Sequence, residues 1–320
     1  MRRTGEFKGV SVVVSSLLIA GWVQAQEVTP NLAERLGYPA ESRLLIIHAD
    51  DLGLAHSANR ASFEALRAGA VSSGSVMMPC PWVPEVVEFQ RENPDADVGL
   101  HLTLNSEWQW FKWGPAASRN QVPGLLDPFG YLWPGVEETL AHARPHEVET
   151  ELRAQIELAL KMGLRPTHLD NHMGTVVRSP EFLAVYLKLG REYNLPVFAA
   201  RPWLDMAPYG RELIGALPEI LDGMSGLYED PGRDGWTEAY ARMVRNLRPG
   251  VTQMIVHLAY DDAEMRRIAF DHPDFGSAWR QKDFETMMSS GFRELLEQEG
   301  VRLITWREIG RALGLTGRQP

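Results

Sequence analysis

The 320-residue sequence predicts an α/β protein with a parallel sheet. From Arg43 onward, short apolar runs of strand length alternate with amphipathic runs of helix length, which is the pattern of repeated β–α units. Polar residues, Asp and His above all, stand where four of the apolar runs end. The sheet is either open and doubly wound or a barrel. A barrel is favoured because alternation within the runs separates a polar face from an apolar one.

The individual elements follow from the hydrophobic period, taken in chain order. Alternating, aliphatic-rich runs predict strands at 44–49, 73–78, 98–104, 167–170, 197–200, 252–257 and 301–305. Amphipathic runs predict helices at 55–68, 83–92, 145–162, 180–193, 236–247, 277–299 and 306–312. Two stretches fit neither pattern and are predicted as irregular inserts, at 105–144 and 203–235. We expect one barrel domain at 43–314, preceded by an N-terminal extension at 26–42.

The first 25 residues have the form of a secretory signal peptide. Basic residues precede an apolar run at 10–23, and small side chains lie before a cleavage point after Ala25. The run is shorter than the roughly 20 apolar residues of a membrane-spanning helix. Bulky Trp22, close to the cleavage point, keeps an uncleaved membrane anchor as the alternative. We expect an exported protein, periplasmic or secreted, with no stable membrane span after cleavage.

Composition and charge exclude several classes of protein. Hydrophobic residues make up 44% of the chain and charged residues 23%, which is typical of a globular protein with a sizeable core. The formal net charge of −10 disfavours binding to nucleic acid. The chain has one cysteine, Cys80, so an internal disulfide is excluded.

Polar residues at the ends of four predicted strands point to a functional site. These ends lie at 48–51, 99–103, 169–172 and 256–257. Sites in parallel α/β folds form at the carboxyl ends of the strands, so these side chains are expected at one rim. Asp50 and Asp51 would point to opposite faces of a continuing strand, and a bend favoured by Gly53 would bring both to the rim. The alternative is that one of the two caps the helix predicted from residue 55.

Two histidines are the best candidates for metal ligands. His101 and His172 lie at strand ends, and two imidazoles with one carboxylate form a recurring set for divalent metals. Asp170 is well placed to orient a ring nitrogen from behind. A histidine buried for structural reasons is the alternative at each position, and it is the interpretation for His168. The role of His48 is left open.

Three motifs, in order, resemble those of the YdjC/ChbG-like carbohydrate deacetylases. They are IHADDLGL at 47–54, GLHLTL at 99–104 and THLDNH at 167–172, and the likeness extends from about residue 43 to 305. The resemblance implies an irregular (β/α) barrel of about seven parallel strands, similar to a TIM barrel. It also implies a hydrolase that uses a divalent metal, zinc or magnesium, to remove N-acetyl groups from an amino sugar or oligosaccharide.

The resemblance further implies roles for five residues. The metal ligands would be Asp51, His101 and His172, the catalytic base Asp50, and the general acid His257. Two positions depart from the family pattern. Gly174 stands where a further histidine is frequent, and Leu258-Ala259 follow His257 where Pro-Gly is frequent.

The chemistry of amide hydrolysis agrees with this set of residues. The reaction needs an activated water, stabilisation of an oxyanion and a proton for the leaving amine. A divalent metal lowers the pKa of bound water from about 15.7 towards about 7 and polarises the acyl oxygen. Asp50 would accept the proton of the water. We expect a neighbouring carboxylate to keep His257 protonated near neutral pH, so that it can protonate the amine.

Two further residues are candidates for binding the sugar. Trp110, in the aromatic run 108–113, offers a ring face, and the alternative is a loop that folds its own aromatic residues onto the barrel. Arg201 follows a predicted strand and is a candidate donor, with a salt bridge as the alternative. The sequence leaves the oligomeric state open, a homo-oligomer included.

Two other functions compete with deacetylation. One is a metal-dependent phosphoesterase or another amidohydrolase on the same barrel, and the other is a non-catalytic carbohydrate-binding protein. The intact set of Asp and His residues argues against loss of activity. The sequence has no Gly-x-Ser-x-Gly motif, which weakens the interpretation as a serine hydrolase.

Overall fold

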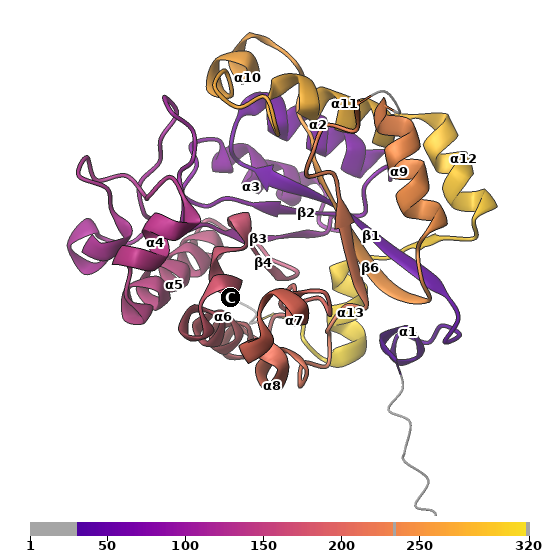
Figure 1. Ribbon diagram of the computed structural model, residues 1–320, viewed down its shortest axis with the longest axis horizontal. Coiled ribbons are helices and arrows are strands. Elements are labelled where there is room, and N and C mark those ends of the chain that lie inside the picture. Colours follow the sequence, from indigo (N-terminus) through magenta and orange to yellow (C-terminus); the bar gives the residue numbers. More distant parts are fainter. Residues whose placement is uncertain (1–30, 233–234, 318–320) are drawn as a thin grey trace, which may run out of the picture.

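The computed structural model describes residues 31–232 and 235–317, in which helices surround a central sheet (Figure 1). The predicted signal peptide lies outside these residues. The strands are β1 (Arg43–Leu52), β2 (Ser73–Val76), β3 (Val98–Leu102), β4 (Leu169–Asn171), β5 (Gly223–Gly226), β6 (Gly250–His257) and β7 (Arg302–Leu303). Among the described residues, no helix is both long and apolar enough to cross a bilayer.

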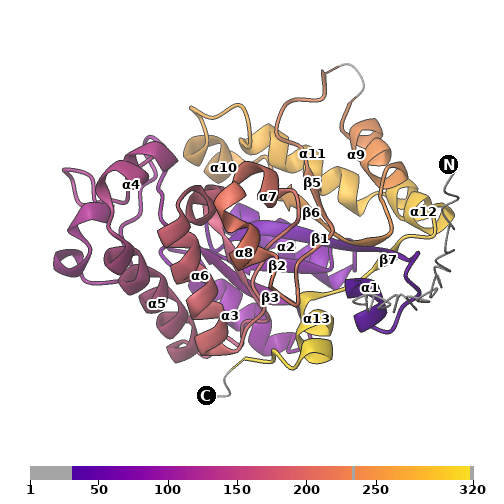
Figure 2. The same cartoon turned by 60° about the horizontal axis from the view of Figure 1, so that its bottom comes forward.

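Most of the helices lie between successive strands along the chain and around the sheet (Figure 2). The α-helices are α1 (Leu32–Arg35), α2 (His56–Arg67), α3 (Val83–Glu92), α4 (Val136–His142), α5 (Pro145–Lys161), α6 (Pro180–Tyr193), α7 (Trp203–Met206), α8 (Arg211–Ile214), α9 (Gly235–Arg245), α10 (Ala263–Ile268), α11 (Ser277–Met288), α12 (Ser290–Gln298) and α13 (Trp306–Leu313). Short 3₁₀ segments are η1 (Arg119–Gln121), η2 (Pro123–Leu125), η3 (His172–Arg178) and η4 (Pro208–Gly210).

The sheet is parallel and curls into a barrel-like form, as predicted. Its strands lie in the order β4-β3-β2-β1-β6-β5, each paired with the next, and β7 pairs with the first part of β1. Segment 197–200 joins the two ends of this path. The N–H of Phe198 donates to the carbonyl of Leu169 (2.8 Å), and the N–H of Leu221 donates to the carbonyl of Ala199 (2.9 Å). These bonds connect β4 to the residues that lead into β5.

Several predicted elements differ from the structure. The inserts 105–144 and 203–235, expected to be irregular, contain the short helices α4, α7 and α8, and α10 lies where no helix was predicted. The predicted strand 197–200 consists of isolated bridges rather than a regular strand. Strand β5 lies within 203–235, which was expected to be irregular. Its sequence, GMSG, lacks β-branched residues, and its pairing with β6 decides its conformation. The predicted helix 277–299 is two helices, because Ser289 is extended and its hydroxyl caps α12 by accepting from the N–H of Phe292 (3.2 Å).

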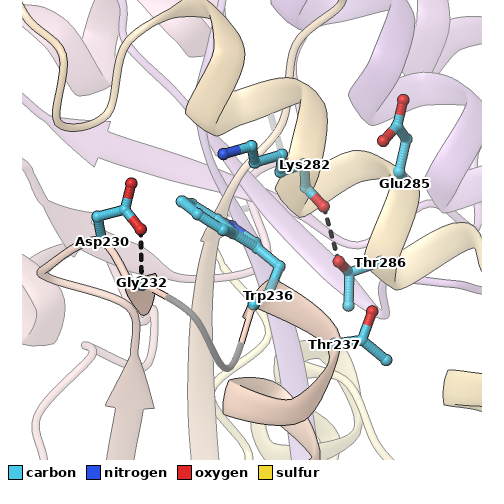
Figure 3. A pocket seen from close by; sticks show the side chains of 8 residues that line it. Asp230, Gly232, Trp236, Thr237, Lys282, Glu285 and Thr286 are labelled. Carbon is cyan, nitrogen blue, oxygen red and sulfur yellow. Dashed lines mark hydrogen bonds between the residues drawn. The ribbon is translucent and has the colours of Figure 1, made fainter.

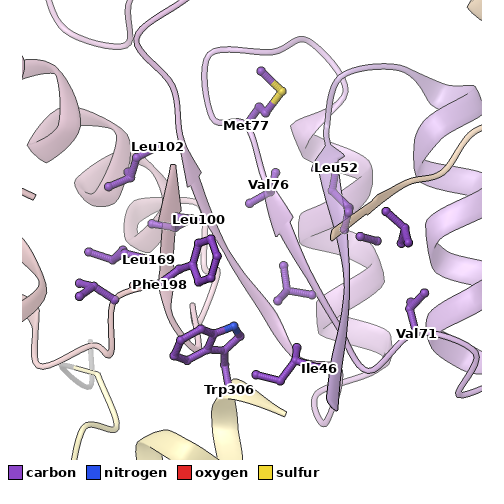
Figure 4. Close-up of a cluster of buried hydrophobic side chains, with 14 of the residues drawn as sticks. Ile46, Leu52, Val71, Val76, Met77, Leu100, Leu102, Leu169, Phe198 and Trp306 are labelled. Atoms are coloured by element: carbon purple, nitrogen blue, oxygen red, sulfur yellow. The ribbon is translucent and has the colours of Figure 1, made fainter. Parts of the chain in front are cut away.

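The two faces of the strands differ in polarity, as the alternation predicts. In β1, His48 points inward, and its ring nitrogens lie 3.0 Å from the hydroxyls of Ser73 and Ser75 on β2. Its neighbours Ile47 and Ala49 are apolar and fully buried. Trp306 lies among buried apolar side chains at the end of the barrel where the strands begin (Figure 4). Its backbone N–H donates to Asp97, the residue before β3 (2.9 Å). The polar mouth is therefore at the opposite end, where the strands finish.

Gly99 lies where β3 passes close to the ring of His168, and this contact predicts that a larger residue at position 99 lowers the stability of the protein. A Cβ at position 99 would lie 2.3 Å from Cε1 of His168, which is buried and stacked on Trp306 with the ring centroids 5.1 Å apart. We expect Gly99→Ala to lower the free energy of unfolding by about 1–3 kcal/mol, the usual cost of overpacking. Denaturant unfolding measures it. Gly291→Ala is the control, because nothing lies within 4 Å of a Cβ there, and an equal loss in both variants would contradict the prediction.

Candidate metal centre and active site

The adjacent carboxylates of Asp50 and Asp51 lie at the end of β1, where the strand leaves regular geometry. Asp50 is still paired with His257 of β6. Asp51 has a φ of +65°, and the register between β1 and β2 shifts at this point. The chain therefore bends first at Asp51 and turns again at Gly53, whose φ of +85° agrees with the bend expected there. The bend at Asp51 directs both carboxylates towards the mouth of the barrel.

Neither carboxylate caps α2, which was the alternative considered from the sequence. The residue before this helix, Ala55, makes no side-chain cap. Instead Glu264 covers the start of α2, accepting from the N–H groups of His56 (3.3 Å) and Ser57 (2.8 Å). Both aspartates thus remain available to the site.

Three of the predicted residues come together at the mouth. Oδ1 of Asp51 lies 3.5 Å from Nε2 of His101 and 3.5 Å from Nδ1 of His172. These two ring nitrogens are 3.3 Å apart. All three side chains are buried, although they come from three different strand ends. The structure therefore places the implied ligand set in one cluster.

This cluster fits a divalent metal ion. Oδ1 of Asp51 is buried and has no hydrogen-bond partner among the described residues, a costly arrangement for a carboxylate unless a cation or donor occupies the position. The candidate ligand atoms of Asp51, His101 and His172 all lie within 4.8 Å of one another. Two imidazoles and one carboxylate leave further coordination positions for water and substrate. These three residues could hold the metal.

Each candidate ligand also has a partner on its outer side. Nδ1 of His101 lies 3.2 Å from the hydroxyl of Ser75 and 3.4 Å from Oδ2 of Asp170. Asp170 is paired with His101 across β3 and β4, so it lies where the sequence analysis expected an orienting carboxylate.

The outer partners of the other two candidate ligands were not predicted from the sequence. Nε2 of His172 lies 3.0 Å from Oε2 of Glu107, and Nη2 of Arg280 donates to Oδ2 of Asp51 at 2.7 Å. Glu107 belongs to an insert without a regular pattern. Arg280 lies within a predicted helix, where a charged residue ordinarily faces solvent. No local sequence signal marks either residue.

A second group of buried residues lies beside the first. Nε2 of His48 is 3.2 Å from Oδ1 of Asp50 and 3.2 Å from Oδ2 of Asp170. His48 therefore links Asp50 to the carboxylate behind His101. Its role, open from the sequence, is that of a polar connection between these carboxylates.

The charges of the cluster shift its pKa values in opposite directions. Burial and the nearby carboxylates of Asp170 and Asp51 raise the pKa of Asp50 well above its ordinary value. Burial acts in the same direction on Asp51, but the Arg280 guanidinium and His172 hold the pKa of that carboxyl well below its usual range. Burial alone would lower the pKa of His172, yet Glu107 and Asp51 raise it to about 10. Of the two adjacent aspartates, Asp50 is thus the more basic.

His257 faces the same mouth from the end of β6. Its Nε2 lies 3.9 Å from Oδ2 of Asp50, and its backbone N–H donates to Asp283 on α11 (3.1 Å). Burial, together with the positive groups of Arg280, His101 and His172, lowers the pKa of His257 to about 3. The expectation that a carboxylate keeps this ring protonated at neutral pH is wrong. Burial and the nearby cationic groups outweigh the attraction of Asp51.

The chain turns sharply after His172. Met173 has a φ of +56° and Gly174 a φ of +67°. Position 174, where a histidine is frequent in the YdjC/ChbG-like proteins, thus has a left-handed backbone conformation here, which suits glycine. The turn leaves Met173 exposed beside His172, one of the candidate ligands.

The two predicted sugar-binding residues lie on the surface. Trp110 is 68% exposed, whereas Trp108 and Trp113 of the same run are buried. Most of these aromatic side chains therefore fold onto the barrel. Nε of Arg201 lies 3.3 Å from Oδ1 of Asp222, which is the salt bridge considered as its alternative.

Two surface hollows lie elsewhere on the molecule. One, of about 310 Å³, is lined by residues of α9 and α11 that include Trp236 and Lys282 (Figure 3). The other, of about 550 Å³, is lined by residues of α2 and α11 and by Tyr260. The linings include none of the candidate ligands, so the chemistry of the mouth is separate from both.

Comparison with known proteins agrees with the geometry of the mouth. The family model of the YdjC-like proteins matches residues 44–298. The chain belongs to this family. The resemblance based on the three motifs is confirmed, and the match includes all five residues to which that resemblance gave a role.

Relatives of this YdjC-like protein match it over most of their length. A carbohydrate deacetylase of Thermus thermophilus is 33% identical over 295 residues, which cover 88% of this chain and 99% of the relative. A carbohydrate deacetylase of Enterococcus faecalis is 32% identical, with 84% and 98% covered. A crystal structure of a candidate cellobiose-phosphate cleavage protein from Enterococcus faecalis superposes with a TM-score of 0.70 at 25% identity, with 84% and 99% covered.

Proposed function

We propose that this YdjC-like protein is a carbohydrate deacetylase that removes N-acetyl groups from an amino sugar or oligosaccharide with the help of a divalent metal, zinc or magnesium. One observation carries the proposal. Asp51, His101 and His172 converge at the mouth of the barrel, and a buried oxygen of Asp51 among them has no hydrogen-bond partner in the described part of the chain. The names of the relatives support the substrate class.

The metal and the side chains of the protein have different roles in the proposed reaction. When bound, the metal supplies Lewis acidity, which activates water and polarises the acyl oxygen. Asp50 accepts the proton that water loses as it attacks the acyl carbon. Its raised pKa suits a general base, because a base is most effective when its pKa is close to the working pH.

His257 completes the movement of protons. The ring is neutral before the reaction, because its pKa is lowered to about 3, and it lies 3.9 Å from the carboxylate of Asp50. In the proposed sequence His257 takes from Asp50 the proton that Asp50 accepted from water, and passes it to the nitrogen of the leaving amine, so that Asp50 is again ionised. One proton therefore moves from water to the amine, and acetate and a free amino sugar are the products.

Mass spectrometry of acetylated sugars incubated with the purified protein tests the proposal. We expect some substrates to lose one acetyl group and release acetate, with the activity abolished by a chelator and restored by added metal. Phosphate release from phosphorylated sugars in place of acetate would favour the phosphoesterase. Binding without turnover at any metal concentration would favour the carbohydrate-binding protein.

We also propose that the protein is exported, on the basis of the apolar run at 10–23 and the small residues, Val23 and Ala25, before a cleavage point after Ala25. The mature chain is expected to begin at Gln26. N-terminal sequencing of protein recovered from an exporting host measures this. A membrane-retained chain that still carries residues 1–25 would show an uncleaved anchor instead.

A further inference from the structure

Glu107 lies directly behind one of the candidate metal ligands. It belongs to the insert that follows β3, and its side chain is only 17% exposed. One carboxylate oxygen, Oε2, lies 3.0 Å from Nε2 of His172. The other, Oε1, accepts from Nε1 of Trp108. Both oxygens of this carboxylate are thus used inside the protein.

The Glu107 contact decides which nitrogen of His172 faces the metal position. A carboxylate only accepts hydrogen bonds, so in a neutral His172 ring the proton is on Nε2, and the lone pair that a metal would use is on Nδ1. Nδ1 is the atom that faces Asp51 and His101. His101 is turned the other way, because its Nδ1 faces Ser75 and Asp170 while its Nε2 faces the cluster.

Arg280 lies behind the carboxylate ligand. It is 1% exposed, its Nη2 donates to Oδ2 of Asp51 (2.7 Å), and its Nε donates to the carbonyl of Phe275 (2.7 Å). Oδ2 is engaged in this way, whereas Oδ1 of Asp51 faces the two histidines and has no hydrogen-bond partner among the described residues, so Oδ1 is the oxygen offered to a metal. The planar guanidinium is held by these two contacts at once, on Phe275 and on Asp51, an arrangement that the single ammonium group of a lysine does not offer.

The indole of Trp108 connects these two partners. Its Nε1 donates to Glu107, and its ring centroid lies 5.5 Å from Cζ of Arg280, within the range of a cation–π contact. Trp108 is 2% exposed, so the contact is made away from water. A continuous path therefore runs from His172 through Glu107, Trp108 and Arg280 to Asp51.

We propose that Glu107, Trp108 and Arg280 form an outer brace that positions two metal ligands, so that His172 binds through Nδ1 and Asp51 through Oδ1 alone. The inference rests on the metal site of the proposed function and extends it to three positioning residues. Such outer partners typically contribute ten- to a hundredfold to metal affinity.

The brace is separate from the contacts that hold the insert in place. Glu151 on α5 accepts from the N–H groups of Ala116 (2.9 Å) and Ala117 (2.8 Å), which anchors the insert directly. Trp133 donates through Nε1 to the carbonyl of Gly124 (2.9 Å) within the same insert. Each residue offers a control of the same type as a brace residue, one a buried glutamate and the other a tryptophan.

The experiment compares Glu107→Gln and Trp108→Phe with the controls Glu151→Gln and Trp133→Phe in the full-length protein. Zinc affinity is measured by competition with a chromophoric chelator, the ligand geometry by the visible spectrum of the cobalt-substituted protein, and the folding of the metal-free protein by its melting temperature. We expect Glu107→Gln to weaken zinc binding by about ten- to a hundredfold and to alter the cobalt spectrum. Trp108→Phe removes only the hydrogen bond to Glu107, so we expect it to weaken zinc binding less than Glu107→Gln does. In the double variant, Trp108→Phe should cause no further loss beyond that of Glu107→Gln alone.

The controls separate positioning from loss of stability. Glu151→Gln and Trp133→Phe are expected to keep zinc affinity and the cobalt spectrum, whatever they do to the melting temperature. Unchanged affinity and spectrum in Glu107→Gln, in a protein whose wild type binds zinc, would overturn the brace and leave the proposed function intact. A wild-type protein that binds neither zinc, cobalt nor magnesium would instead overturn the metal site and the brace with it.

Discussion

His101→Ala and His172→Ala are each expected to lose metal binding and, with it, deacetylase turnover, while the protein stays folded. Both rings face the mouth of the barrel and contact Asp51 at 3.5 Å, so their removal takes away a ligand without opening the apolar core. The loss of affinity should exceed the ten- to hundredfold typical of residues behind the ligands. The metal content after dialysis measures the loss of binding, and circular dichroism of the same samples shows whether the protein stays folded.

The exposed His146 provides the control for these two variants. His146→Ala removes an imidazole at the start of α5 and is expected to keep both metal and turnover. Full metal occupancy in His101→Ala or in His172→Ala would remove that histidine from the ligand set. The metal-binding residues would then have to be sought in the second group, around His48.

Asp50→Asn is expected to keep the metal but to lower turnover by about 10²–10⁴-fold, the usual contribution of a general base. An amide has the shape of the carboxylate but cannot accept the proton. The fold should tolerate the change, because burial and two neighbouring carboxylates already disfavour a charge at this position. The turnover number and the metal content of the same preparation measure the two effects.

Asp51→Asn is the matched comparison, since it makes the same chemical change one residue along the chain. It replaces the charged oxygen that faces both histidines by a neutral amide oxygen, which is a weaker metal ligand. It also removes the carboxylate to which Arg280 donates. This variant should therefore lose metal affinity as well as turnover. If Asp50→Asn turned over substrate at the rate of the wild type with its metal bound, another residue would have to be the base.

The gathering of Asp and His side chains at one rim was predictable from periodicity and topology, whereas the choice of Asp51 over Asp50 as the third ligand came from the resemblance to the family. The two-residue repeat of β3 puts His101 on the polar face, and parallel strands bring their carboxyl ends together, which is where Asp51 and His172 are found. The register of the sheet agrees, since Asp50 is paired with His257 and His101 with Asp170.

The parts that were not predicted depend on long-range contacts. Strand β5 has a sequence without strand character and exists through its pairing with β6. Glu107 and Arg280 reach the cluster from an irregular insert and from the middle of a helix, where no pattern marks a buried charge. The neutral state of His257 depends on burial and on cationic groups from three other segments. A sequence shows the identity of such groups but not their proximity.

The central position of β1 has a consequence for the order in which the protein folds. This strand, among the first elements made, pairs with β6 and with β7, which are among the last. Contacts between such distant parts of a chain slow folding, because the entropy of closing a large loop is lost before the contacts form. The barrel can therefore be completed only after nearly the whole chain has been synthesised. A ribosome-bound chain that ends before β6 is expected to remain sensitive to protease, with the aspartates of β1 not yet joined to their histidine partner on β6.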